Sequence, residues 1–218
     1  MLEAIFNPDN AVFCFINKVI DLVVLSLVWA LCCLPVITIG PACAALYYAV
    51  VKSVRRQRSY AVREFFRAFR ENLKKGIAVH LVLLLFGAMM FVSDIPLVLT
   101  FLDTGRAGNL FFLALFAVKA FLYLGMICWL YPLMSRFEEG LLKLAEAALY
   151  LLLKYLPSTL VSIAVLAVSA LLLWWEPLLL SVVPGLAVLV ISLVTEPGLR
   201  RMCPAGEKQQ EDQWYLEK

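Results

Sequence analysis

Long apolar segments alternate with short polar segments along the whole chain. A helix needs about 20 mainly apolar residues to cross the hydrocarbon core of a bilayer, so these segments predict membrane helices. Six are expected in chain order, and the second is short: residues 18–34, 41–58, 77–101, 110–134, 157–175 and 178–195. The pattern therefore predicts an all-α fold, a polytopic membrane helix bundle.

Two prolines bound the first reversal of the chain, which reads PVITIGP over residues 35–41. Its prolines, glycine and β-branched residues disfavour a continuous helix, so we expect a tight apolar turn. Residues 41–58 follow as the short helix, which ends where Lys52 and Arg55 can reach the cytoplasmic headgroups. The alternative is that this segment re-enters the membrane and leaves the N-terminus outside.

Two segments have an amphipathic helical pattern in place of a continuous apolar one. In residues 60–75, aromatic and basic side chains recur on separate faces, so we expect this helix to lie flat on the inner leaflet with its aromatic side down. In residues 138–156, Glu139 and Lys143 have the favourable i,i+4 orientation. The other faces of that segment are Leu and Ala, which predicts that most of it is buried. Both helices are expected in the plane of the cytoplasmic surface.

The distribution of positive charge predicts how the chain is threaded. Residues 52–76 contain nine of the 19 Lys and Arg residues and only two acidic residues. A short loop of this kind is retained in the cytoplasm, because Lys and Arg set the orientation of the neighbouring helices. With both termini inside, 17 cations are cytoplasmic, Arg106 is outside and Lys119 lies within the membrane. Both termini are therefore expected to be cytoplasmic.

The composition agrees with a membrane protein, since 63% of the residues are hydrophobic, 16% are charged and the mean hydropathy is +0.89. Too few polar residues remain for a separate soluble domain. We expect one integral membrane domain over residues 1–198 and a polar cytoplasmic tail over residues 199–218. The six cysteines include no CxxC pair, which indicates neither a metal site nor a disulfide framework.

We single out three ionisable residues of the predicted membrane helices, Asp21, His80 and Lys119, whereas Asp94 marks the far end of the third helix. A charge costs at least about 2.5 kcal/mol at the centre of a membrane, so it usually faces a partner or a wet cavity. Asp21 and Lys119 could pair with each other. The alternatives are that Asp21 is hydrated near the inner surface and that Lys119 snorkels along its helix. His80 has no ligand-type partner at local spacing, which favours an interfacial or packing role.

No HExxH, GxSxG, P-loop or dinucleotide-binding motif is present. We therefore assign no catalytic, cofactor-binding or metal-binding residue, and we expect that the protein is not an enzyme and needs no cofactor. The basic segment favours contact with anionic lipid headgroups or with a protein partner, and not with nucleic acid. The residues expected to make this contact are Arg55, Arg56, Arg63, Arg67, Arg70 and Lys74.

Three stretches together resemble the YesL-like family of bacterial membrane proteins of unknown function: residues 5–55, FFRAFREN, and YPLMSRFEEGLLKLAEAALYLLLKYLP. The run LPVxTIGPAxAALYY is the most specific part of the resemblance, which spans roughly residues 5–195. It implies a small all-helical protein of the bacterial cytoplasmic membrane. Genes of that family often lie beside carbohydrate ABC transporters, and the resemblance carries no catalytic residues.

Two functions are compatible with these observations. The first is a non-enzymatic accessory or regulatory partner of a carbohydrate ABC import system, in contact with its permease subunits. The second is a small-solute transporter or channel, which predicts an aqueous cavity lined by Asp21, Lys119 or His80.

Overall fold

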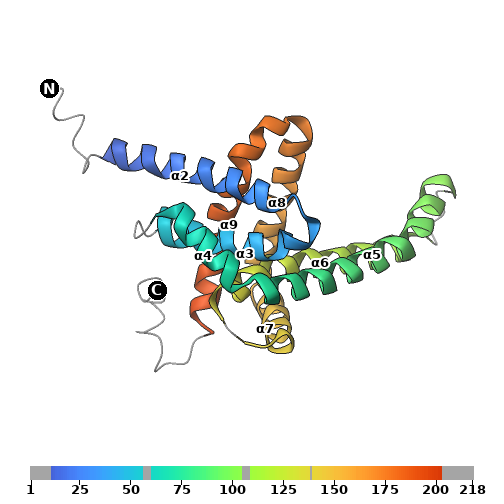
Figure 1. Cartoon of the computed structure of the whole chain (residues 1–218). Coiled ribbons are helices and arrows are strands. Elements are labelled where there is room, and N and C mark those ends of the chain that lie inside the picture. Colours follow the sequence, from blue (N-terminus) through green and yellow to red (C-terminus); the bar gives the residue numbers. More distant parts are fainter. Residues whose placement is uncertain (1–10, 56–59, 105–108, 138, 203–218) are drawn as a thin grey trace.

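The computed structural model describes residues 11–55, 60–104, 109–137 and 139–202, and the regular elements in these ranges are all helices (Figure 1). This confirms the predicted all-α membrane bundle. Within these ranges five segments are long and apolar enough to cross a bilayer: Val36–Arg55, Leu73–Pro96, Leu113–Arg136, Leu156–Trp175 and Val183–Arg200. The chain is therefore a multi-pass membrane protein.

The elements follow the predicted order with shifted boundaries. In chain order they are α2 (Ala11–Cys32), the 3-10 turn η1 (Val36–Thr38), α3 (Ile39–Ala49), the π-helical turn η2 (Val50–Arg55), α4 (Ala61–Glu71), α5 (Leu73–Thr104), α6 (Asn109–Arg136), α7 (Leu141–Lys154), α8 (Leu156–Trp175), the 3-10 turn η3 (Pro177–Ser181) and α9 (Val183–Arg200). The reversal predicted between the two prolines is confirmed, although α3 begins before Pro41.

Helix α3 lies at the centre of the molecule and contributes to two hydrophobic cores. One face of α3 packs on α6 around the fully buried Trp129, through Ala44 and Tyr47. The opposite face packs on α2 and α4 around the fully buried Phe65. Small residues such as Ala44, Ala45 and Ala49 let these neighbours approach closely, as expected of helices packed within a membrane protein.

Two glycines allow α3 and α5 to start side by side. A Cβ on Gly40 would clash with the carbonyl oxygen of Gly76, and a Cβ on Gly76 would lie 2.8 Å from the nitrogen of Pro41. Gly76 falls between the predicted helices 60–75 and 77–101. The structure places it inside α5, because its missing side chain serves this contact and does not interrupt the helix.

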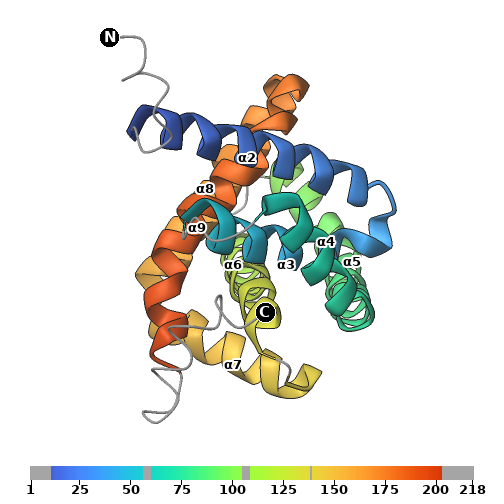
Figure 2. The same cartoon turned by 60° about the vertical axis from the view of Figure 1, so that its left-hand side comes forward.

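Two helical hairpins leave this centre in different directions, α5 with α6 and α8 with α9 (Figures 1 and 2). A helix of the length of α5 is about 48 Å long, which exceeds the roughly 30 Å hydrocarbon core. Such a helix must tilt or extend beyond the bilayer. Divergent, tilted hairpins are therefore compatible with a membrane location.

Three expectations about the amphipathic and terminal segments are corrected. Phe65 on α4 is fully buried against α2 and α3, so the aromatic side of this helix packs mainly on protein and not on lipid. Helix α7 buries only the stripe of Leu144, Ala148, Leu151 and Leu152, and Leu142 outside this stripe is 81% exposed. Helix α9 continues through Pro197, and Leu199, expected to begin the tail, is fully buried.

Candidate functional site

Two buried ion pairs lie on either side of the C-terminal end of α3. Lys52 donates a hydrogen bond to Glu64 of α4 over 2.8 Å, and the two side chains are 3% and 6% exposed. Arg136 of α6 donates to both carboxylate oxygens of Glu196 of α9 over 2.8–2.9 Å. We refer to these four residues, with Tyr47, Tyr48, Arg55 and Thr195, as the polar core.

Adjacent tyrosines of α3 connect the two pairs. The Tyr47 hydroxyl donates to Glu196 over 3.1 Å and lies 3.1 Å from the Thr195 hydroxyl. The Tyr48 hydroxyl accepts a hydrogen bond from Lys52 over 3.3 Å. The polar core therefore joins α3, α4, α6 and α9 through side chains that the protein shields from water.

The π-helical turn η2 contributes Lys52 and Arg55 to the polar core. π-helical turns occur often at functional sites, because the extra residue per turn changes the direction of the side chains that follow. Arg55 was expected to contact lipid or a protein partner, and this stays a prediction. It is half-buried, and its Nη1 donates to the backbone carbonyl of Ser192 on α9 over 3.1 Å.

Helix α4 has a buried acidic side and an exposed basic side. Glu64 faces α3, whereas Arg63 and Arg70 of α4 and Lys74 at the start of α5 are exposed and Arg67 is partly exposed. We call Arg63, Arg67, Arg70 and Lys74 the basic face. Arg67 donates to Glu71 over 3.1 Å, and this hydrogen bond raises the pKa of the guanidinium. Arg56 lies outside the described residues, and contact of the basic face with lipid or a partner stays a prediction.

Lys119 pairs with Asp94 and not with Asp21. Its Nζ donates to Asp94 Oδ1 over 2.6 Å, between the two helices of the α5–α6 hairpin. The sequence had placed Asp94 only as a marker of the helix end, and it had offered Asp21 as the partner. Asp21 lies on α2, which packs against α3, α4 and α9, and it is partly exposed. The pairing follows from the hairpin, which brings Asp94 and Lys119 level with each other.

His80 lies near the start of α5, where its Nδ1 is 3.0 Å from the hydroxyl of Tyr131 on α6. A Cβ on Gly40 would lie 2.6 Å from the Cβ of His80, so the ring sits at the junction of α3, α5 and α6. Asp21, His80 and Lys119 lie on different helices, and among the described residues no hydrogen bond or ion pair joins any two of them. An open groove of about 390 Å³ between α8 and α9 is lined by none of the three and is almost wholly apolar.

The charges of the polar core are paired with one another inside the protein. Among the residues that the structure describes, no group of three or more His, Cys, Asp or Glu comes together in a way that could hold a metal ion. The buried carboxylates are instead neutralised by Lys52 and Arg136, which satisfies the charge of each in a low-dielectric interior. The arrangement fixes helices relative to one another and presents the basic face on a rigid support.

Sequence reasoning missed Glu64, Glu196, Arg136 and Asp94 as interacting residues. Each is a charge close to apolar residues, which is the signal that could have marked it, since such a charge needs a partner. The last predicted helix ends at residue 195, just before Glu196, because Pro197 and Gly198 disfavour its continuation. Gly198 in fact lies against the indole of Trp129, where a Cβ would be 2.8 Å from the ring.

The fold and the polar core define a multi-pass helical membrane protein built on a central, largely buried helix. A family model described as "Protein of unknown function, DUF624" matches residues 22–94. The match covers the first reversal, α3, α4 and most of α5, so the chain is similar to an uncharacterised family in this part. The curated proteins contain no match. The solved structures contain none either.

Proposed function

We propose that the protein is a non-enzymatic accessory or regulatory partner of a carbohydrate ABC import system in the bacterial cytoplasmic membrane, with both termini in the cytoplasm. The resemblance to the YesL-like family supports the kind of partner, through the neighbourhood of its genes. The match to a family of unknown function covers the most specific part of that resemblance. The orientation rests on the partition of Lys and Arg.

The observation that carries the proposal is the rigid presentation of the basic face. The buried pair of Lys52 with Glu64 and the fully buried ring of Phe65 fix α4 on α3. A binding surface that is already ordered loses less conformational entropy on association than a flexible one. Exposed cations on such a surface favour an acidic partner, because complementary charge speeds association and selects the partner. We assign this partner as a permease subunit.

Co-purification from native membranes tests the proposal. The test variant carries Arg63→Glu and Arg70→Glu on the basic face. The matched control carries Lys143→Glu and Lys154→Glu, which reverse two exposed charges on α7. We expect the wild type and the control to recover the permease pair of the same operon, and the test variant to recover about tenfold less, equivalent to about 1.4 kcal/mol of binding free energy.

The detergent-extracted yield and the melting temperature of the three proteins establish that each is folded. Equal permease recovery with the test variant and the control would contradict a role for the basic face. Normal carbohydrate uptake in a strain lacking the gene would contradict the accessory function itself.

A further inference from the structure

Residues 22–51 contain no Asp, Glu, Lys or Arg, yet they form two limbs separated by a reversal. The charge-free part of α2 (Ala11–Cys32) is Leu22–Cys32, and the charge-free part after the reversal is Ile39–Val51, which is α3 and the first two residues of η2. At 1.5 Å per residue these two charge-free limbs are only about 17 and 20 Å long, shorter than the roughly 30 Å hydrocarbon core. The whole of α2 and the segment Val36–Arg55 are long enough to cross, so the topology is decided by the depth of the reversal and not by helix length.

The position of the reversal gives an independent measure of depth. Gly40, just after the reversal, lies against Gly76 and His80 of α5. These residues are three and seven positions after Leu73, where α5 begins, so the reversal is about 5–10 Å along that helix. If α2 crossed the whole bilayer, the reversal would lie at the opposite surface, about 30 Å from the cytoplasmic start of α5.

The other end of α3 lies at the same level. Lys52 pairs with Glu64, and α4 runs antiparallel to α3, since Gly40 lies beside residue 76 and Lys52 beside residue 64. The exposed side of α4 carries Arg63 and Arg70, which belong in headgroups or water and not in hydrocarbon. A helix with both ends beside α4 and the start of α5 does not reach the far surface.

The reversal is nevertheless apolar and suited to lipid. The exposed fractions of Leu31, Leu34, Val36 and Ile37 are 66%, 76%, 56% and 52%. Irregular backbone within a membrane needs hydrogen-bond partners. The Thr38 hydroxyl provides one donor there, since its Oγ1 lies 2.6 Å from the Cys32 carbonyl oxygen and 2.7 Å from that of Pro35.

We propose that α2 and α3 form a re-entrant hairpin, which enters the inner leaflet, turns among the acyl chains at residues 33–38 and returns to the cytoplasmic side. The partner of the reversal is the hydrocarbon of the bilayer. Helices α5, α6, α8 and α9 are then the ones that cross, and their even number keeps both termini in the cytoplasm. This topology rests on the orientation set by the Lys and Arg residues and does not depend on the accessory role.

Cysteine labelling in spheroplasts tests the hairpin. Ile37→Cys, Leu178→Cys and Lys143→Cys are each introduced into a variant whose six native cysteines are replaced by Ser. A membrane-impermeant maleimide reacts with a thiolate, which forms in water and not in hydrocarbon. Leu178 is 80% exposed at the far end of the α8–α9 hairpin and is the outside control, and Lys143 on α7 is the inside control.

We expect Leu178→Cys to react in intact spheroplasts and Lys143→Cys to react only after permeabilisation. Ile37→Cys should remain at background in both conditions and react only after denaturation in dodecyl sulfate. Labelling of Ile37→Cys in intact spheroplasts would overturn the proposal in favour of a full crossing. Labelling only after permeabilisation would overturn it in favour of a reversal exposed to the cytoplasm.

A second measurement keeps the native cysteines, in case the cysteine-free protein does not fold. Green fluorescent protein or alkaline phosphatase is fused to the N-terminus of the otherwise unchanged chain. We expect fluorescence and no phosphatase activity, as for the same reporters at the C-terminus. Phosphatase activity at the N-terminus alone would show that α2 crosses while α3 does not, and the hairpin would be wrong.

Discussion

Glu196 is a single carboxylate that joins three helices. It accepts hydrogen bonds from Tyr47 on α3 and Arg136 on α6, and Arg200 of its own helix lies 3.8 Å away. The side chains of Glu196 and Arg136 are 2% and 3% exposed, so neither charge is hydrated. A carboxylate in this position stabilises the fold only while its cations are present.

We therefore predict that Arg136→Met destabilises the protein by about 3–5 kcal/mol, because it leaves the buried charge of Glu196 without its main partner. The double variant Arg136→Met, Glu196→Gln should recover part of this loss, since no buried charge then remains. Unfolding of the purified protein in detergent, followed by tryptophan fluorescence, gives the free energies. A double variant whose loss equals the sum of the two single losses would show that the residues do not interact.

Gly76 illustrates a different constraint, the space between two backbones. A methyl group there would lie 2.8–2.9 Å from the nitrogen, Cα and Cβ of Pro41, and backbone atoms cannot move aside as a flexible side chain can. We predict that Gly76→Ala costs about 1–3 kcal/mol of unfolding free energy. Gly140→Ala is the control, since nothing lies within 4 Å of a Cβ there. It should cost less than about 1 kcal/mol, the effect of changing a helix N-cap. Equal losses would contradict the close approach of α3 and α5.

At the scale of elements, the α5–α6 hairpin carries one ion pair within two otherwise apolar helices. The Asp94 side chain is 6% exposed and that of Lys119 is 34% exposed. The protein therefore buries the carboxylate more completely than the ammonium group. The hairpin extends away from the central helix (Figure 1), and few other polar contacts fix the register of its helices. The pair is placed to align α5 with α6.

A charge exchange tests this alignment. Asp94→Asn alone should lower the stability of the detergent-solubilised protein by at least about 2.5 kcal/mol, since it leaves Lys119 without a counter-charge in an apolar hairpin. The exchange of Asp94→Lys with Lys119→Asp should restore much of that loss. The matched control is Lys143→Met, which breaks the exposed pair with Glu139 and should change stability by less than about 1 kcal/mol. An exchange variant no more stable than Asp94→Asn would contradict the role of the pair.

The elements themselves were the most predictable part of the structure. Hydropathy located the long helices, and i,i+4 spacing predicted the pair of Glu139 with Lys143, which the structure confirms at 3.0 Å. The helix boundaries predicted from neighbouring residues were wrong where a contact with a distant part of the chain keeps the helix continuous. Gly76 and Pro197 lie within helices despite their ordinary tendency to end them, because neighbouring helices hold the surrounding residues in place.

At the scale of the whole molecule, the candidate site was the less predictable part. The partners in the polar core are 12 residues apart for Lys52 and Glu64, 60 for Arg136 and Glu196, and 149 for Tyr47 and Glu196. One sequence supplies no rule that pairs residues at such separations. The basic face, by contrast, follows from local spacing alone, and Arg63, Arg70 and Lys74 are exposed on the surface.

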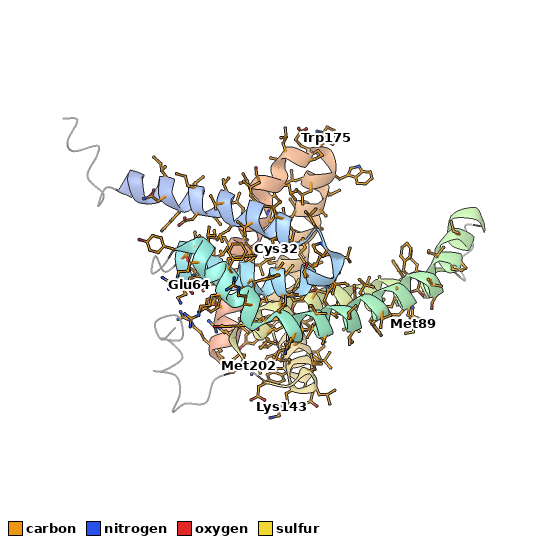
Figure 3. All side chains as sticks on the ribbon, viewed as in Figure 1. Cys32, Glu64, Met89, Lys143, Trp175 and Met202 are labelled. Atoms are coloured by element: carbon orange, nitrogen blue, oxygen red, sulfur yellow. The ribbon has the colours of Figure 1, made fainter. Side chains whose placement is uncertain are left out.

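The molecule also separates its polar and aromatic ends. Trp175 lies at the end of the α8–α9 hairpin, remote from Lys143 on α7 (Figure 3). The exposed fractions of Trp174 and Trp175 are 89% and 86%, which suits the aromatic belt at a membrane–water interface. Charged helices at one end and exposed tryptophans at the other agree with the orientation predicted from the Lys and Arg residues.

The long separation between Tyr47 and Glu196 has a consequence for biosynthesis. When Tyr47 leaves the ribosome, its hydrogen-bond partner Glu196 is still to be translated. The same holds for Arg55, whose acceptor is the carbonyl of Ser192. The early helices must therefore enter the membrane before the last helix can close the interior. Until α9 is inserted, Arg136 lacks the Glu196 carboxylate that neutralises it in the finished protein, so a chain halted before α9 holds this cation without its counter-charge.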